Sequence, residues 1–383
     1  MPNKTTIPAG WKIAKAFECI DVRDGTHATP KPVVDGIPLI TSKNIIEGKL
    51  TLSDFYNVSN EDAREINKRS QVVIGDILIS MIGTVGATAI IKNEPNFVVK
   101  NVGIFKTGSK AILSSFLIKQ FHSKYLQNKI QSLSSGGIQK FISLGQLRKL
   151  PILFPPLPEQ EKIVEVLEAW DSYLEKLSNT IKLKKKIKKG LMQKLLAGKI
   201  RLKGFSESWK TVKIGDCLKI KHGKSQKAVE DPNGQYPILG TGGEMGRATA
   251  FLYDRPSVLI GRKGTINKPK YMETPFWTVD TLFYSEVKDN CYPKYLYYHF
   301  LMINWKQYNE GSGIPSLSAS TISSIKIEIS KSFEEQTAIA QILTTADQEI
   351  EALEKKKAII EQQKKYLLNN LITGKIRLPE FIE

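Results

Sequence analysis

The sequence is poor in the residues that staple small secreted domains or bind structural metals. It has three cysteines and four histidines in 383 residues, and both kinds are scattered along the chain. An odd number of widely spaced cysteines (Cys19, Cys217 and Cys291) excludes a disulfide framework. So few dispersed ligands also argue against a zinc site. We therefore expect no metal, and hydrophobic cores as the source of stability.

Long apolar runs are lacking too. No stretch of eighteen apolar residues occurs, and the polar N-terminus has no apolar run after Lys4. Neither a membrane-spanning helix nor a signal peptide is predicted, so we expect a soluble, cytoplasmic protein. Acidic residues are a minority, with 38 Asp and Glu against 56 Lys and Arg, and the net charge is +18. That excess favours a polyanionic partner, although ribosomal or membrane-surface binding would require the same charge.

Catalytic motifs are the third absence. Gly223-Lys224-Ser225 resembles the end of a phosphate-binding loop, but Leu218 stands where that loop requires a glycine. The sequence shows neither a glycine-rich strand-to-helix turn for S-adenosylmethionine nor a cluster of nuclease-like carboxylates. We therefore predict a binding protein with no catalytic residues of its own.

What the sequence does contain is a long internal repeat. Residues 159–205 return as residues 335–381 at a constant offset of 176, with no gap. Near its end each copy carries the same five residues, Gly-Lys-Ile-Arg-Leu. A repeat of this length indicates that the chain is two copies of one structural plan.

Each copy of the repeat predicts a long helix with a coiled-coil seam. Apolar residues recur at alternating steps of four and three, the a/d pattern of a heptad. The first seam comprises Ile163, Leu167, Trp170, Leu174, Leu177, Ile181, Leu191 and Leu195, with Lys184 and Lys188 between its last members. The second comprises Ile339, Leu343, Ala346, Ile350, Leu353, Ile360, Leu367 and Leu371, with Lys357 and Lys364. A helix of about 37 residues measures about 55 Å, too long for one small core, so we expect the two copies to pair.

Turn residues mark the expected ends of these helices. Pro155 and Pro156 suit the entry to the first helix. Ser332 with Glu335 forms a capping-box pattern at the start of the second. Gly198 and Gly374 stand where a left-handed C-terminal cap belongs.

A globular segment precedes each helix. The expected parts are two segments, 1–155 and 205–330, each followed by a helix, 156–204 and 331–383. Alternating and glycine-bounded apolar stretches predict strands at 72–81, 88–92, 97–105, 257–262 and 277–284. Helical spacing predicts helices at 116–133 and 293–308. The fold class is therefore α+β, with two mixed α/β modules and a pseudo-two-fold repeat. The segments share their ends and a central Gly-Thr turn and differ elsewhere, as two versions of one binding module would.

Polar, cationic loops are the candidate ligand-binding sites. A loop after the first strand of each segment combines glycine, cations and hydroxyls, which can contact phosphates and base edges. The candidates there are Arg23, Thr26, His27, Thr29 and Lys31 in the first segment, and Lys221, His222, Lys224, Ser225 and Lys227 in the second. A basic turn in the second segment adds Arg262, Lys263 and Lys268. An ordinary polar surface loop has the same composition, so composition alone leaves the role of these loops open.

Taken together, these features resemble the specificity (S) subunit of type I restriction-modification systems. The resemblance covers nearly the whole chain and rests on the order module, helix, module, helix. It also rests on Pro156-Leu157-Pro158-Glu159-Gln160 before the first seam, on the Gly-Lys-Ile-Arg-Leu tails, and on Asp24-Gly25-Thr26-His27. Ser332-Phe333-Glu334 departs from the proline-rich entry that is usual in the family.

The resemblance implies a division of labour. Each module would be a target recognition domain for one half of a bipartite double-stranded DNA site. The helices would form an antiparallel coiled coil that docks two methyltransferase (M) subunits, with restriction (R) subunits completing the nuclease. S-adenosylmethionine would belong to M, ATP and magnesium to the partner subunits, and this chain would carry no cofactor. The alternative is a coiled-coil scaffold whose repeated modules bind protein or RNA.

Overall fold

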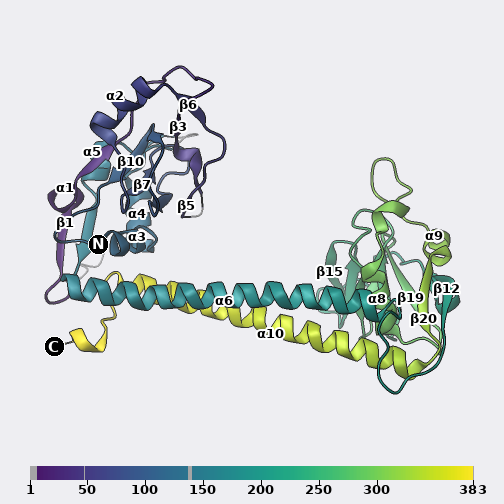
Figure 1. Cartoon of the computed structure of the whole chain (residues 1–383). Helices are drawn as coiled ribbons and strands as arrows, with labels where there is room; N and C mark the ends of the chain where they lie inside the picture. Colours follow the sequence, from purple (N-terminus) through teal and green to yellow (C-terminus); the bar gives the residue numbers. More distant parts are fainter. Residues whose placement is uncertain (1–6, 47, 137–139, 383) are drawn as a thin grey trace. The chain divides into compact units, whose positions relative to one another are not determined.

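A computed structural model describes residues 7–46, 48–136 and 140–382. The chain divides into two compact units, residues 1–176 with 357–383, and residues 177–356. Each unit holds one globular module and one end of each long helix (Figure 1). We call the globular part before the first long helix module 1, and the part between the two long helices module 2.

Module 1 is built around a four-stranded antiparallel sheet in the order β2-β10-β7-β8. The strands of this sheet are β2 (Val22–Asp24), β10 (Val102–Phe105), β7 (Ile77–Ser80) and β8 (Thr88–Ile90). Three smaller sheets are β6 (Tyr56–Val58) with β3 (Ile37–Ile40) and β9 (Val98–Val99); β1 (Lys12–Lys15) with β11 (Pro151–Phe154); and β4 (Ile45–Ile46) with β5 (Lys49–Leu50). The helices are α1 (Ala16–Cys19), η1 (Ser42–Asn44), α2 (Asn60–Ser70), α3 (Ser114–Phe121), α4 (Lys124–Leu133) and α5 (Leu144–Arg148).

Module 2 repeats this scheme with a four-stranded sheet in the order β13-β19-β16-β17. The strands are β13 (Leu218–Lys221), β19 (Leu282–Val287), β16 (Ser257–Gly261) and β17 (Lys270–Met272). Two smaller sheets are β15 (Gly243–Ala248) with β14 (Tyr236–Gly240) and β18 (Trp277–Thr278), and β12 (Trp209–Lys213) with β20 (Lys326–Ser330). The helices are α7 (Ile214–Cys217), α8 (Pro293–Met302), η2 (Trp305–Tyr308) and α9 (Ala319–Ser324), and η3 (Pro379–Phe381) follows the second long helix in the other unit.

One glycine fixes the loop after β2 in module 1 and the loop after β13 in module 2. A Cβ on Gly25 would lie 2.2 Å from the carbonyl oxygen of Val99, and one on Gly223 would lie 2.1 Å from that of Val279. No side chain fits at either distance, so both positions require glycine. The two loops therefore leave their sheets in the same way.

Four predicted elements are broken where the sequence suggested continuity. Residues 116–133 form two helices, because the Ser123 hydroxyl accepts from the backbone N–H of Leu126 and caps a new helix. Residues 97–105 form two strands, because Asn101 has φ of 54° and turns the chain. Residues 277–284 belong to β18 and β19, and residues 293–308 to α8 and η2. The strands predicted at 72–81 and 257–262 shorten to β7 and β16.

The two predicted long helices are continuous and pair as expected. They are α6 (Leu157–Leu195) and α10 (Phe333–Leu371), and every residue of the two predicted seams is buried or half-buried. In unit 1 the start of α6 contacts the end of α10, and in unit 2 the end of α6 contacts the start of α10. The pairing is therefore antiparallel. Figure 1 shows the two helices side by side.

The helix ends agree with the sequence, with one exception. Gly198 and Gly374 adopt the predicted left-handed conformation, with φ of 63° and 65°. Ser332 caps α10 by accepting from the backbone N–H of Glu335 at 3.0 Å. The reciprocal half of the capping box is missing, because the Glu335 carboxylate is taken by Arg201 instead.

Candidate nucleic-acid interface

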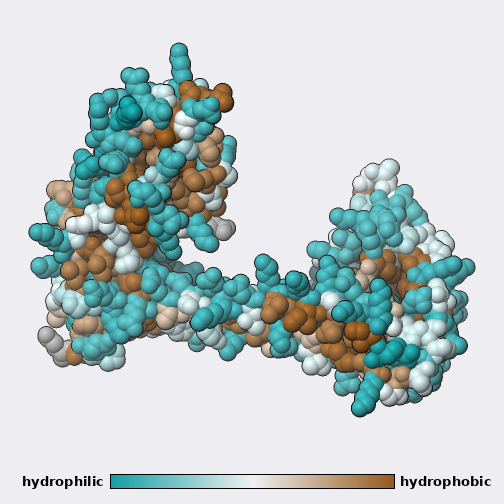
Figure 2. Space-filling model, in the orientation of Figure 1, coloured by the Kyte–Doolittle hydropathy of each residue, from teal (hydrophilic) through white to brown (hydrophobic). Residues whose placement is uncertain are grey.

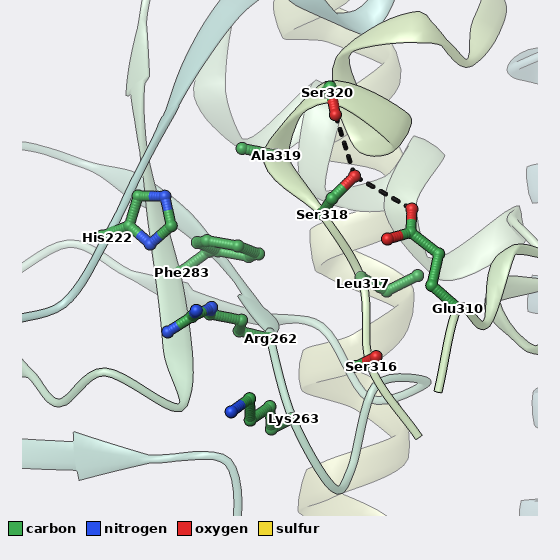
Figure 3. Close-up of a pocket in the computed structure, with 10 residues that line it drawn as sticks. All are labelled: His222, Arg262, Lys263, Phe283, Glu310, Ser316, Leu317, Ser318, Ala319 and Ser320. Carbon is green, nitrogen blue, oxygen red and sulfur yellow. Dashed lines mark hydrogen bonds between the residues drawn. The ribbon is translucent and has the colours of Figure 1, made fainter. Parts of the chain in front are cut away.

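A polar pocket of about 440 Å³ opens on module 2 (Figure 3). Three predicted contact residues line it: His222 just after β13, and Arg262 and Lys263 just after β16. Glu310 and the segment that leads into α9 form the opposite side. The fold thus brings together three stretches, at residues 222, 262–263 and 310–320, that are far apart in the sequence.

Arg262 is held in place but keeps part of its donor capacity. Its Nη1 donates to the side chain and to the backbone oxygen of Asp280. Among the described residues, none accepts from its Nε or Nη2. The guanidinium is therefore held at Nη1 by Asp280, and its Nε and Nη2 donors are available to a ligand.

Glu310 supplies a fixed negative charge across the pocket from this arginine. The hydroxyls of Thr321 and Ser318 both donate to its Oε1, the second at 2.9 Å. These two hydrogen bonds hold the pKa of the Glu310 carboxyl below its ordinary value. Donors and an ionised acceptor therefore face one pocket.

Module 1 carries a pocket of about 390 Å³ at the corresponding place. Its lining is largely apolar: Met81, Ile82, Phe141, Ile142 and Leu144. The polar side holds His27, whose Nδ1 lies 2.7 Å from Oδ1 of Asn101 and whose Nε2 lies 3.0 Å from Oδ2 of Asp24. Asp24 is buried and is also bonded by Arg69. The polar groups of this pocket are therefore engaged with one another.

The two pockets share one backbone frame. The N–H of Ile142 donates to the carbonyl of Met81 at 2.9 Å, and the N–H of Leu317 donates to that of Arg262, also at 2.9 Å. These bonds make Arg262 the structural counterpart of Met81.

Further backbone pairs extend the correspondence around each pocket. The pairs Gly83–Lys140 and Ser135–Phe141 in module 1 match Gly264–Pro315 and Glu310–Ser316 in module 2. Lys263 therefore takes the place of Ile82, Glu310 that of Ser135, and Ser316 that of Phe141. Asp24 and His222 correspond as well, since each precedes its loop glycine.

The other predicted contact residues lie outside the pockets. Arg23 pairs with Asp21 at 2.7 Å, Thr26 accepts from Ala28, Thr29 accepts from Lys100, and Lys31 is exposed. In module 2, Lys221 pairs with Glu286 at 3.3 Å, and Lys224, Ser225, Lys227 and Lys268 are exposed. The backbone of Lys224 is fixed by Thr278 and by the indole of Trp277.

Sequence reasoning missed several pocket residues. Glu310 sits in a polar stretch with no motif, and Phe141 lies in no element that the sequence predicted. Only the pairing of these segments with the ends of β16 and β7 makes them part of a site. Among the described residues, no group of three or more His, Cys, Asp or Glu side chains could hold a metal ion. Within the same part of the chain, no helix is long and apolar enough to cross a membrane.

The comparison with protein families decides the classification. The family described as "Type I restriction modification DNA specificity domain" matches residues 34–191 and again residues 206–362, which together make up most of the chain. The chain belongs to this family. Each match begins inside one module and extends into the long helix that follows it.

Relatives within the specificity-domain family span the full length. The MjaX type I restriction enzyme specificity subunit of Methanocaldococcus jannaschii is 27% identical and covers 97% of this chain and 95% of its own. The crystal structure of a Type-I restriction-modification S subunit from M. genitalium has a TM-score of 0.62 at 18% identity, covering 97% and 98%. A second solved structure is described as "Structural basis underlying complex assembly and conformational transition of the type I R-M system". Its chain has a TM-score of 0.64 at 16% identity, and the match covers 97% of this chain and 100% of that chain. The two structures show a shared fold.

In this specificity-domain protein, each module packs where the end of one long helix meets the start of the other, and we call this junction the seat of the module. A repeated ion pair joins the two helix ends at each seat. In unit 1, Arg377 donates through Nε and Nη2 to the two oxygens of Glu159, at 3.0 and 2.8 Å. In unit 2, Arg201 makes the same paired bonds to Glu335, at 2.7 and 3.0 Å. Both glutamates are buried. Burial alone would raise the pKa of Glu335, but the hydrogen bonds from Arg201 and Ser330 outweigh it and lower the pKa.

A second ion pair joins the two helices in each unit. Asp171 binds Lys364 in unit 1, and Asp347 binds Lys188 in unit 2, again at the repeat offset. Module 1 adds Lys119, 2.6 Å from Asp171, and module 2 adds the hydroxyl of Tyr298, 2.9 Å from Asp347. Lys188 and Lys364, which interrupt the predicted apolar seams, therefore pair with carboxylates on the facing helix.

Glutamines complete each seat through backbone atoms. Gln160 accepts from the N–H of Leu113 at 2.9 Å and donates to the carbonyl of Ala111 at 2.7 Å. Gln336 accepts from the N–H of Tyr292 at 2.8 Å and donates to the carbonyl of Asn290. Each module is thus hydrogen-bonded to its long helix at the loop that precedes α3 in module 1 or α8 in module 2.

Proposed function

We propose that this chain is the non-catalytic specificity subunit of a type I restriction-modification system. Its two modules would be target recognition domains, within 1–155 and 205–330, each reading one half of a bipartite asymmetric site in double-stranded DNA. The observation that carries this proposal is the pair of pockets, which share a backbone frame and differ in lining. Two half-sites of different sequence require two such readers, and the net charge of +18 favours a DNA partner.

Partner subunits would supply the chemistry. The long helices would dock two methyltransferase subunits, and restriction subunits would join them. S-adenosylmethionine, ATP and magnesium would be bound by those partners, and such a complex would act in the cytoplasm. Apolar side chains off the seam support docking: Leu183 on α6 is 58% exposed, and its repeat counterpart Ile359 on α10 is 55% exposed. Figure 2 shows hydrophobic side chains grouped on the helical part of unit 2.

Methylation mapping tests this function. The full chain, produced in cells together with the methyltransferase subunit of its own system, should direct adenine methylation to one bipartite asymmetric motif. The purified chain alone, incubated with radioactive S-adenosylmethionine and DNA, should transfer no methyl groups. Transfer by the chain alone would contradict the non-catalytic role. Absence of any motif in the presence of the partner, together with retention of RNA or protein by the chain, would favour a scaffold instead.

A further inference from the structure

We propose that the two pockets select opposite kinds of base pair: the module 2 pocket takes a G·C pair, and the module 1 pocket takes an A·T pair through the methyl group of thymine. This inference rests on the proposed function, because it concerns how each module reads its half-site. It is carried by the position-by-position correspondence of the two linings.

The donor side of the module 2 pocket suits guanine. In the major groove, guanine presents two acceptors, O6 and N7, and a planar guanidinium can donate to both at once. Arg262 is oriented through Nη1 by Asp280, which leaves Nε and Nη2 as an adjacent pair of donors among the described contacts. Orientation by Asp280 reduces the rotamer freedom that binding would otherwise remove. Lys263 and His222 lie on the same side of the pocket as Arg262 (Figure 3).

The acceptor side suits the cytosine of the same base pair. Cytosine presents its N4 amino group as a donor in the major groove, and a carboxylate is a matching acceptor. The Glu310 carboxylate is held in place by hydrogen bonds from the hydroxyls of Thr321 and Ser318. Because both hydroxyls reach Oε1, Oε2 retains acceptor capacity. Arg262 on one side of the pocket therefore offers donors to guanine, and Glu310 on the other side offers an acceptor to cytosine. Together they complement the major-groove edge of a G·C pair.

The module 1 pocket lacks both halves of this arrangement. Met81 replaces Arg262, Ser135 replaces Glu310, and Phe141 replaces Ser316 in the shared frame. In the described lining, the titratable groups are Asp24 and His27, and they bond each other. The surface that a ligand would meet is apolar and includes Phe141, which is 46% exposed. Apolar contact is the means by which proteins recognise the C5-methyl of thymine.

The test uses the full chain with its own methyltransferase subunit and compares methylation motifs. The wild-type motif should contain a G·C pair in one half that Arg262→Ala relaxes to any base, with discrimination at that position falling about tenfold or more. Arg262→Lys should relax it similarly, because lysine keeps the charge but loses the paired donors. Phe141→Ser should relax an A·T position in the other half only.

Each variant carries an internal control for folding, since the half-site read by the unaltered module must stay unchanged. The matched control is Arg255→Ala, an exposed arginine before the opposite end of strand β16, which should leave the motif intact. If Arg262→Lys preserves the motif, Arg262 contacts phosphate and the inference is wrong. A motif that is present but unaltered in every pocket variant also overturns it. If the wild-type chain yields no motif at all, the proposed function fails first and the inference falls with it.

Discussion

Module 1 and module 2 use the same backbone hydrogen bonds to hold pockets of opposite character. In module 1 an aspartate and a histidine satisfy each other beside an apolar wall. In module 2 an arginine and a glutamate face the pocket from two sides. Because the frame consists of amide and carbonyl groups and of tightly packed glycines, it tolerates a change of the side chains around the opening. We therefore expect the ability to distinguish ligands to lie in these few positions, and stability to lie elsewhere.

The largest expected effect concerns the seats of the two modules. Glu335→Ala would leave Arg201 without its buried partner and should lower the free energy of unfolding by about 3 kcal/mol. Glu159→Ala should cost less, because Glu335 also accepts from Trp209 and Ser330. Denaturant unfolding measures both. Glu351→Ala, which breaks an exposed i,i+4 pair with Lys355 on the same helix, should cost much less than either of these, because exposed ion pairs contribute little to stability. Equal costs for all three variants would show that the seats contribute little.

An exchange of pocket linings comes next. Ile82→Lys in module 1 should increase the salt dependence of duplex DNA binding, with about one further counterion released. Lys263→Ile in module 2 should decrease it by the same amount, whereas Arg262→Met should leave the slope unchanged, because a side chain that contacts a base neutralises no phosphate. Affinities of the full chain for duplex DNA at a series of salt concentrations give the slopes. A slope that moves in one module and not in the other would break the equivalence of the pockets.

The fragment of residues 1–204 tests whether copy one of the helix can replace copy two. In a two-fold dimer, Asp171 would meet Lys188 of the partner fragment, and Glu159 would meet its Arg201, so the repeated ion pairs survive. Lys184 and Lys185 would lose Glu349 and Glu354, because the repeat places Tyr173 and Ser178 there. We expect an antiparallel dimer by sedimentation analysis, with the site-specificity of one module only.

Restoring the missing carboxylates sharpens this expectation. Tyr173→Glu with Ser178→Glu should tighten the fragment dimer by about tenfold, since four exposed ion pairs would return across the two-fold axis. The gain should shrink as salt is added. A fragment that stays monomeric with and without these changes contradicts the interchangeability of the two helices.

The smallest expected effect concerns a buried position that is a histidine, His299, in module 2 and a glutamine, Gln120, in module 1. Burial lowers the pKa of His299 to about 3, and its Nε2 has no partner among the described residues. Below the ordinary value of 6.5, the unfolded chain binds a proton that the folded one does not. The free energy of unfolding therefore falls as the pH drops from 6.5 towards 3.

Gln120 occupies the corresponding place in module 1. Leu113 and Tyr292 donate to the equivalent glutamines Gln160 and Gln336, and Gln120 follows Leu113 at the same separation as His299 follows Tyr292. His299→Gln should remove this part of the pH dependence, a difference below about 1 kcal/mol between pH 7 and pH 6. The loss caused by protonation of Glu335, whose pKa is depressed from 4.5, should remain at lower pH. Unchanged slopes in thermal or denaturant unfolding would show that His299 does not titrate in the unfolded chain as assumed.

The sequence predicted the helical part of the fold well because periodicity is a local property. A stripe with steps of four and three is visible in Ile163, Leu167 and Trp170 without any knowledge of the partner. The breaks at Ser123 and Asn101 were missed, since they depend on a single cap or a single positive φ. Arg262, Lys263 and His222 were selected by charge and loop position, whereas Glu310 joined the pocket only through long-range strand pairing. Glu159 and Asp171 were visible as repeated charges, but their partners could be identified only from the antiparallel register.

The hydrogen bonds from a helix glutamine to the backbone of each module have a consequence for inheritance. Gln160 and Gln336 hold their modules through amides and carbonyls, and these groups are the same whichever amino acid provides them. A gene crossover within the repeated helices would place an unfamiliar module on a seat that already fits it. If the modules are target recognition domains as proposed, target choice could thus change in one genetic step, while the contacts between module and helix stay the same on both sides of the exchange.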